Sequence, residues 1–108
     1  MADATVDINM VAMEVILNAG DGRACIDQAL ESMAQLDFDA VEAHLAEAET
    51  KIQKAHNAQT DTIQRQAAGE DVEYSLLFTH AQDTLMTISA ELHMTQKMLP
   101  VVRALAGK

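Results

Sequence analysis

Aromatic residues, proline and glycine are all scarce in this chain of 108 residues. It has no tryptophan, one tyrosine and two phenylalanines, so the large rings that fill many protein cores are nearly missing. One proline and four glycines leave few positions for turns, which predicts few but long secondary-structure elements. A β-sandwich or an α/β fold needs many turns, and the composition therefore disfavours both.

Cysteine and basic residues are scarce as well. The single cysteine, Cys25, excludes a disulfide within the chain. Seven basic residues stand against seventeen acidic ones, and the formal charge of −10 would be repelled by nucleic acid and by anionic membranes. No apolar run approaches the roughly 20 residues that span a bilayer, and no apolar signal segment opens the chain. We expect a cytoplasmic protein without membrane insertion, for which a basic protein is the natural partner.

Alanine and methionine supply most of the apolar content, with 19 and 7 residues respectively. Alanine has the highest helix propensity and lets helices approach closely, so the composition predicts an all-α fold. The length suits a single domain, residues 1–108, with a modest core. We expect an antiparallel three-helix bundle.

Apolar spacing and capping residues place the three helices. Asp37 and Ser75 are suitable N-caps for the second and third helices, because their side chains can accept hydrogen bonds from the free N–H groups of the first turn. Gly69 ends the second helix. The expected helices cover about residues 9–35, 37–68 and 75–106.

Three residues interrupt this pattern. Gly20 and Gly22 each cost about 1 kcal/mol relative to alanine inside a helix. The first helix therefore either breaks there or continues, with the glycines allowing close packing. Pro100 lacks the N–H group that the preceding turn needs, and we expect it to bend or end the third helix.

The third helix carries two stripes at helical spacing. The core stripe suits packing on the other two helices and consists of Leu77, Ala81, Leu85, Ile88, Leu92 and Leu99. The second stripe repeats mostly at alternating four and three residues, as in a coiled coil, and consists of Leu76, His80, Asp83, Thr87, Ala90, Met94, Met98, Val101 and Leu105. The second stripe suggests self-association, because a three-helix bundle needs only one buried face per helix. Alternatively, both stripes merge into one broad buried face of a monomer.

Asp83 lies in the second stripe and would meet its own copies in a symmetric assembly. Two carboxylates about 5 Å apart repel by roughly 3 kcal/mol at an effective dielectric constant of 20. Such an interface needs protonation, water or a divalent cation, and carboxylates completed by water favour a hard ion such as Mg²⁺. A parallel homotrimer leaves room for water ligands on the axis, but the spacing does not exclude a dimer.

His80 lies one turn before Asp83 on the same stripe. A neutral imidazole is a good nucleophile near neutral pH, and a phosphorylated imidazole is a labile donor suited to phosphoryl relay. Thr84 and Thr87, one and two turns further on, can donate hydrogen bonds to a phosphoryl group. The alternative interpretation is a solvated or hydrogen-bonded histidine without a chemical role.

A second polar cluster, His56 with Gln59 and Thr60, lies on the second helix. It either lines the same site as His80 or is a solvated surface. The chain has no His-x-x-x-His or Glu-x-x-His spacing and no glycine-rich phosphate loop, which argues against a zinc hydrolase, a di-iron bundle or an ATP-dependent kinase. His44 and His93 are interpreted as structural or solvent-facing, and Cys25 as an inert small residue.

Two segments carry a resemblance to a known family. His80-Ala-Gln-Asp83-x-Leu-Met-Thr87, preceded by Ala55-His56-x-x-Gln59-Thr60, resembles the lactose/cellobiose-type (lactose/N,N'-diacetylchitobiose) enzyme IIA of the bacterial phosphoenolpyruvate-dependent sugar phosphotransferase system. Asn18-Ala-Gly-Asp-Gly-Arg23 is similar to a further segment of that family. The likeness runs from about Asn9 to Leu105.

The resemblance implies a trimer of three-helix bundles with a continuous first helix. The histidine matching His80 accepts a phosphoryl group from the carrier HPr and passes it to a cysteine of the cognate enzyme IIB during disaccharide uptake. Thr84, Thr87, His56 and Gln59 would support the phosphoryl site. The aspartate matching Asp83 gathers one divalent metal ion, expected to be magnesium, per trimer.

This chain departs from the family pattern at Thr84, where a second histidine is usual. We expect either slower transfer or a Thr84 hydroxyl that replaces the missing donor. The alternative to a phosphocarrier is a non-catalytic helical trimer that uses the Asp83 ring and a metal only for assembly, or a monomeric helical adaptor. The transported sugar would contact the membrane component, so lactose, cellobiose and chitobiose stay open.

Overall fold

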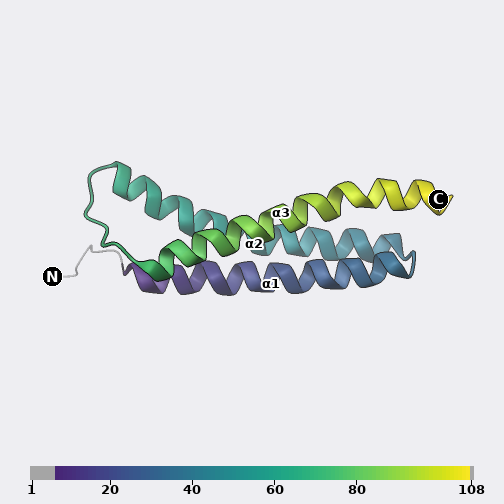
Figure 1. Ribbon diagram of the computed structural model, residues 1–108, viewed down its shortest axis with the longest axis horizontal. Coiled ribbons are helices and arrows are strands. Elements are labelled where there is room, and N and C mark those ends of the chain that lie inside the picture. The colour runs from purple at the N-terminus through teal and green to yellow at the C-terminus, as the bar shows by residue number, and fades with distance from the viewer. Residues whose placement is uncertain (1–6, 108) are drawn as a thin grey trace.

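The computed structural model describes residues 7–107, which form three long α-helices. The helices are α1 (Ile8–Ala34), α2 (Phe38–Ala67) and α3 (Leu76–Leu105). They run up, down and up along a rod of 61 × 20 × 19 Å (Figure 1). The predicted antiparallel three-helix bundle is confirmed, and each observed helix end lies one residue from the expected one. Within the described residues, no helix combines the length and the apolar character required to cross a membrane.

Each helix begins at a side chain that caps its first turn. Asp37 accepts a hydrogen bond from the N–H of Ala40 at 3.3 Å, and Ser75 accepts one from the N–H of Phe78 at 3.1 Å. These are the two predicted N-caps. Asp7 caps α1 in the same way, through the N–H of Met10 at 3.2 Å. Each of these oxygens satisfies an N–H group that has no partner within its helix.

Helix α1 is continuous through both glycines, so the alternative of a break is wrong. Gly22 is buried where α1 crosses α2, and a Cβ atom there would lie 2.6 Å from Cγ1 of Ile52. Gly20 faces solvent and has nothing within 4 Å of such an atom. The two neighbouring glycines therefore differ in purpose, because only Gly22 lets the helices approach closely.

Alanine substitutions separate these two glycines. Gly20→Ala should raise the free energy of unfolding by about 0.5–1 kcal/mol, because alanine has the better helix propensity and meets no obstacle. Gly22→Ala should bring no such gain, because the added methyl group must displace Ile52. Urea denaturation followed by circular dichroism measures both. Equal stabilisation by the two variants would contradict the close-packing role of Gly22.

Pro100 lies inside α3 and does not end it, since the helix continues to Leu105. The expectation that this proline terminates the helix is therefore wrong. Pro100 has no N–H to offer the carbonyl of Gln96, but the proline is exposed, so water can reach this part of the backbone. The chain reverses elsewhere, at Leu36 (φ 60°) between α1 and α2 and at Gly69 (φ 95°) after α2.

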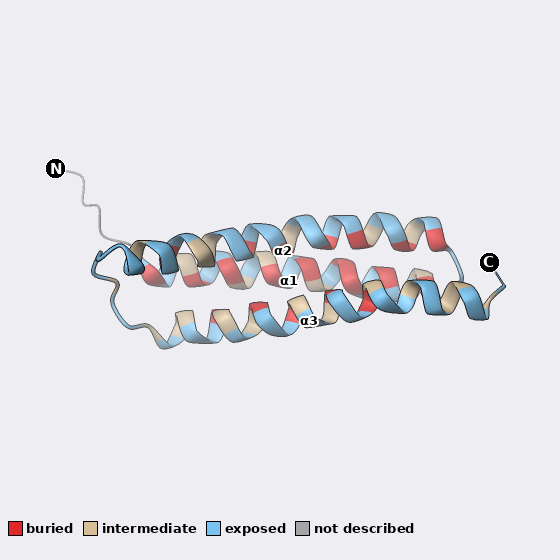
Figure 2. Ribbon diagram, turned by 90° about the horizontal axis from the view of Figure 1, so that it is seen from above, coloured by how far each residue is buried: buried red, intermediate tan, exposed pale blue. Residues whose placement is uncertain are grey.

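The core lies along the centre of the bundle, where one face of each helix is buried (Figure 2). The α3 residues in this core are Ala81, Leu85, Ile88 and Leu92. Leu77 and Leu99 are partly buried and pack against the core. The core stripe is thus confirmed. Every residue of the second stripe is exposed, with Leu76 at 72% and Leu105 at 84%. The alternative in which both stripes merge into one buried face is therefore wrong for a single chain.

Candidate functional site

His80 lies in the second turn of α3 with its side chain exposed to solvent. The helix is fixed at this point by the Ser75 cap and by the fully buried Ala81, the next residue along the chain. Ser75 also donates a hydrogen bond to Oδ1 of Asn9 at 2.8 Å, which ties the start of α3 to the start of α1. The imidazole is therefore held on a rigid helix and is accessible to a visiting molecule.

The hydroxyls of Thr84 and Thr87 are both engaged with the helix backbone. Oγ1 of Thr84 donates to the carbonyl oxygen of His80 at 2.8 Å, and Oγ1 of Thr87 donates to the carbonyl oxygen of Asp83 at 2.9 Å. Such bonds to the residue four positions earlier are common for threonine in helices. Each hydroxyl would have to rotate away from the backbone before it could donate to a phosphoryl oxygen near His80.

The carboxylate of Asp83 is exposed and makes no hydrogen bond or ion pair with the residues that the structure describes. Between residues 7 and 107, no three histidine, cysteine or acidic side chains of one chain lie close enough together to hold a metal ion. A metal site at Asp83 would therefore need ligands from beyond a single copy of the chain.

His56 lies on α2, away from His80. Its Nε2 is 3.4 Å from the hydroxyl of Thr60, a weak contact, and its ring lines a shallow groove with Ser89 and Leu92 of α3. The α2 residues level with His80 lie six to ten positions further on, at Thr62 to Gln66, which line a cavity together with Thr79 and Gln82. Six to ten residues of helix correspond to about 9–15 Å. One chain thus does not bring His56 and His80 together.

Gln59 is half-buried, and its Oε1 atom is fully covered and has no hydrogen-bond partner in the described part of the chain. The residue continues the buried row of Ile52 and Ala55 on α2 toward Thr62. An unsatisfied buried oxygen costs about 1–3 kcal/mol. Gln59 therefore points to the core at this height and not to the solvated surface that His56 occupies.

Sequence reasoning missed an ion pair between α1 and α3. Arg23 binds Glu91 through two hydrogen bonds of 2.9 and 3.0 Å, and this bonding raises the pKa of the arginine further. Both side chains are about 40% exposed, so the pair contributes at most about 1 kcal/mol. The two residues stand 68 positions apart, and nothing in the sequence indicates that they meet.

The same ion pair borders a groove of about 790 Å³ on the side of the second stripe. The groove runs between α1 and α3, and it is lined mainly by apolar side chains, among them Ile26, Leu30, Ala90, Met94 and Met98. It begins at Thr87 and extends away from His80 toward the C-terminal half of α3. The second stripe therefore forms one wall of a long apolar depression.

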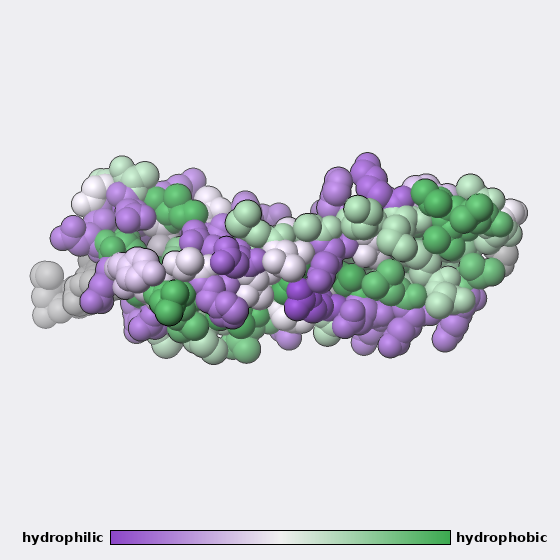
Figure 3. All heavy atoms as spheres, viewed as in Figure 1, coloured by the Kyte–Doolittle hydropathy of each residue, from purple (hydrophilic) through white to green (hydrophobic). Residues whose placement is uncertain are grey.

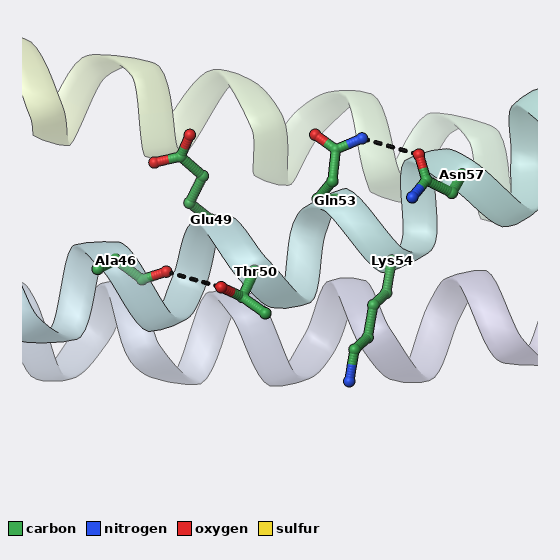
Figure 4. A pocket seen from close by; sticks show the side chains of 6 residues that line it. All are labelled: Ala46, Glu49, Thr50, Gln53, Lys54 and Asn57. Atoms are coloured by element: carbon green, nitrogen blue, oxygen red, sulfur yellow. Dashed lines mark hydrogen bonds between the residues drawn. The ribbon is translucent and has the colours of Figure 1, made fainter.

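A further hollow, of about 450 Å³, lies on α2 alone (Figure 4). Two pairs among its six lining residues are hydrogen-bonded along the helix: Thr50 donates to the carbonyl of Ala46 at 3.2 Å, and Gln53 donates to Asn57 at 2.8 Å. The side chains of Glu49 and Gln53 point to one side of α2, and that of Lys54 points to the opposite side (Figure 4). This hollow contains none of the predicted site residues, and its polar groups do not converge on a common point.

The remaining histidines and the cysteine are not part of a reactive site among the described residues. His93 is exposed and His44 is partly buried. The thiol of Cys25 is buried, and this burial together with the nearby Glu47 raises its pKa, which keeps the thiol protonated at neutral pH. These positions agree with the structural interpretation of all three residues.

Comparison with known proteins gives consistent matches. Residues 10–103 match the family model of the lactose/cellobiose-specific IIA subunit of the phosphotransferase system. The lactose-specific EIIA component of Staphylococcus epidermidis is 37% identical over 81 residues, which cover 75% of this chain and 78% of that protein. The oligo-beta-mannoside-specific EIIA component of Bacillus subtilis is 31% identical over 93 residues, which cover 86% and 84%.

Solved structures resemble the fold over nearly its whole length. The cellobiose-specific enzyme IIA from Bacillus anthracis superposes with a TM-score of 0.88 at 29% identity, covering 96% of this chain and 95% of that one. The structure of PtcA from S. mutans has a TM-score of 0.85 at 34% identity, with coverage of 87% and 92%.

Proposed function

This chain belongs to the lactose/cellobiose-specific IIA family of the sugar phosphotransferase system, and we propose that it carries a phosphoryl group on His80. The donor is the phosphohistidine of HPr, and the acceptor is a cysteine of the cognate enzyme IIB. The observation that carries the proposal is the position of His80, exposed on a rigid helix whose opposite face is locked into the core. The relatives are named for different sugars, and lactose, cellobiose and chitobiose stay open for this chain.

The transfer needs only an accessible imidazole with a free lone pair. A ring nitrogen of neutral His80 attacks the phosphorus of the donor, a new N–P bond forms, and the N–P bond to the donor imidazole breaks. In the second step a cysteine thiolate of enzyme IIB attacks the phosphorus, and His80 is released as a neutral imidazole. Thr84 and Thr87 can stabilise the phosphoryl oxygens once their hydroxyls turn away from the backbone.

The test uses purified proteins. Incubation with phosphoenolpyruvate, enzyme I and HPr should add one phosphoryl group per chain, visible as a mass increase in intact-protein mass spectrometry. The group should be lost in acid, as expected for an N–P bond, and it should pass to enzyme IIB when that protein is added. Absence of labelling in the presence of fully phosphorylated HPr would overturn the proposal.

We further propose that three chains assemble around the second stripe. Its apolar members are exposed in the single chain, among them Met94 at 60%, Val101 at 57% and Leu105 at 84%. Burial of one such side chain stabilises an interface by about 1.5–3 kcal/mol. The adjoining apolar groove between α1 and α3 would receive side chains of the next subunit. This arrangement brings three copies of Asp83 toward the axis.

The three Asp83 carboxylates fit a divalent ion of the hard class, such as Mg²⁺, because each is exposed and free of other partners within the described residues. When bound, the ion would neutralise carboxylates that otherwise repel one another. The residues that hold it are the three aspartates, and water would complete the coordination.

Replacing Asp83 with leucine should therefore remove metal binding without dissolving the trimer. Wild-type protein should contain one divalent ion per three chains by elemental analysis and lose trimer stability in chelator, because each carboxylate pair then repels by roughly 3 kcal/mol. Asp83→Leu should contain no metal and be insensitive to chelator. The matched control is Asp61→Leu, which replaces an exposed aspartate on α2 and should behave as wild type. A trimer of Asp83→Leu that still dissociates in chelator would contradict this account.

A further inference from the structure

Methionine is prominent on the surface of the bundle. The exposed methionines of the described residues are Met10, Met13, Met86, Met94 and Met98. Their exposed fractions range from 39% for Met98 to 68% for Met10, whereas Met33 lies in the core at 4%. The methionine thioether is an apolar group that oxidants convert into a polar sulfoxide. An exposed methionine in an apolar contact surface is therefore a position where oxidation changes the surface chemistry.

Met94 and Met98 differ from the other exposed methionines because they line the apolar groove between α1 and α3. One helical turn separates them, and both belong to the second stripe. Figure 3 shows apolar atoms gathered over the second half of α3, the part of the helix that carries both residues. In a single chain both thioethers are open to solvent, whereas in the proposed trimer the next subunit covers them.

The polar side chains that line the groove beside these two methionines already have partners. Oγ1 of Thr95 donates to the carbonyl oxygen of Glu91 at 2.7 Å, and Arg23 donates two hydrogen bonds to the carboxylate of Glu91. A sulfoxide oxygen in the closed groove would have to compete for these donors. Burial of a polar group without a hydrogen bond is unfavourable, so the oxidised groove no longer suits an apolar neighbour.

We propose that Met94 and Met98 form an oxidation-sensitive site that controls self-association of this chain. The proposal rests on the proposed trimer and adds its regulation by an oxidant of the peroxide class. The thioether sulfur attacks one peroxide oxygen, an S–O bond forms, and the O–O bond breaks. With hydrogen peroxide the products are the sulfoxide and water, so the sulfur is oxidised by two electrons and the peroxide is reduced. Oxidation occurs in the single chain, which then cannot reassemble.

The first test follows the oxidation of each methionine by hydrogen peroxide, using peptide mapping by mass spectrometry at several protein concentrations. Met86 is the internal reference, because it is 66% exposed and lies outside the second stripe, so its rate should not depend on protein concentration. The rates for Met94 and Met98 should fall relative to Met86 by at least about tenfold when the trimer forms, because the next subunit shields both thioethers.

The second test measures the mass of peroxide-treated protein by sedimentation equilibrium. Treated wild type should sediment as the 11.7 kDa chain at concentrations where untreated protein is a trimer, with an unchanged circular dichroism spectrum. Treated Met94→Leu/Met98→Leu should stay trimeric, since leucine has a similar volume and no sulfur. The matched control Met10→Leu/Met13→Leu removes two exposed methionines of α1 and should dissociate as wild type does.

Reduction provides a test on the wild-type chain itself. Incubation of the oxidised protein with both methionine sulfoxide reductases, one for each sulfoxide epimer, should restore the trimer. Three results would overturn the proposal: a trimer that survives complete oxidation of Met94 and Met98, dissociation of treated Met94→Leu/Met98→Leu, or a ratio of the Met94 and Met86 rates that stays constant with concentration. If untreated protein is a single chain at every concentration, the proposed trimer itself fails, so the two failures are distinguishable.

Discussion

Replacing His80 with glutamine is expected to abolish phosphorylation of the chain by HPr, with a loss of at least about three orders of magnitude in rate. Glutamine keeps a polar side chain of similar reach but has no nitrogen lone pair that can attack phosphorus. The fold should be unaffected, because His80 is exposed and its side chain makes no hydrogen bond within the described residues. Intact-protein mass spectrometry after incubation with phosphoenolpyruvate, enzyme I and HPr gives the extent of labelling.

Two other histidines provide controls for this experiment. His93 is an exposed histidine on the same helix, outside the second stripe, and His93→Gln should be labelled at the wild-type rate. His56→Gln should also be labelled, since within one chain His56 lies about 9–15 Å from His80 along the bundle axis. A slower rate for His56→Gln would indicate that a neighbouring subunit brings His56 to the site. Undiminished labelling of His80→Gln would refute the assignment of the phosphoryl acceptor.

Met94→Asp is expected to dissociate the proposed trimer into single chains. Met94 is 60% exposed in one chain and lies in the apolar section of the second stripe. Three new carboxylates would meet near the axis, where each pair repels by roughly 3 kcal/mol and each loses hydration. Sedimentation equilibrium should report the 11.7 kDa chain in place of a species of about 35 kDa.

Met86→Asp is the control for the effect of a charge alone. Met86 is 66% exposed on the same helix but outside the second stripe, so the variant should stay trimeric and keep its helical content. The pair Met94→Asp and Asp83→Leu makes a further contrast, because both alter the second stripe but only the first adds charge to it. An intact trimer of Met94→Asp would show that the stripe does not form the interface.

The amino-acid sequence determined the elements and their faces. Asp37 and Ser75 mark helix starts because a short polar side chain in front of an apolar periodic segment satisfies the first free N–H groups. The spacing along α3 distinguished a buried stripe from an exposed one, since 3.6 residues per turn fix the angle of every side chain about its own helix axis. His80 and Asp83 were found in the same way, as polar residues on the exposed stripe.

The tertiary structure alone decided which residues of different helices lie at the same level along the bundle axis. Sequence periodicity gives angles about one axis but says nothing about the sliding of one helix along another. For this reason neither the contact of Arg23 with Glu91 nor the separation of His56 from His80 could be predicted. The same limit applies to Gln59, whose polar side chain looked like part of a surface cluster until packing placed its oxygen inside the bundle. The close packing at Gly22 could not be predicted either, because Ile52, the residue that leaves no room for a side chain there, comes from another helix.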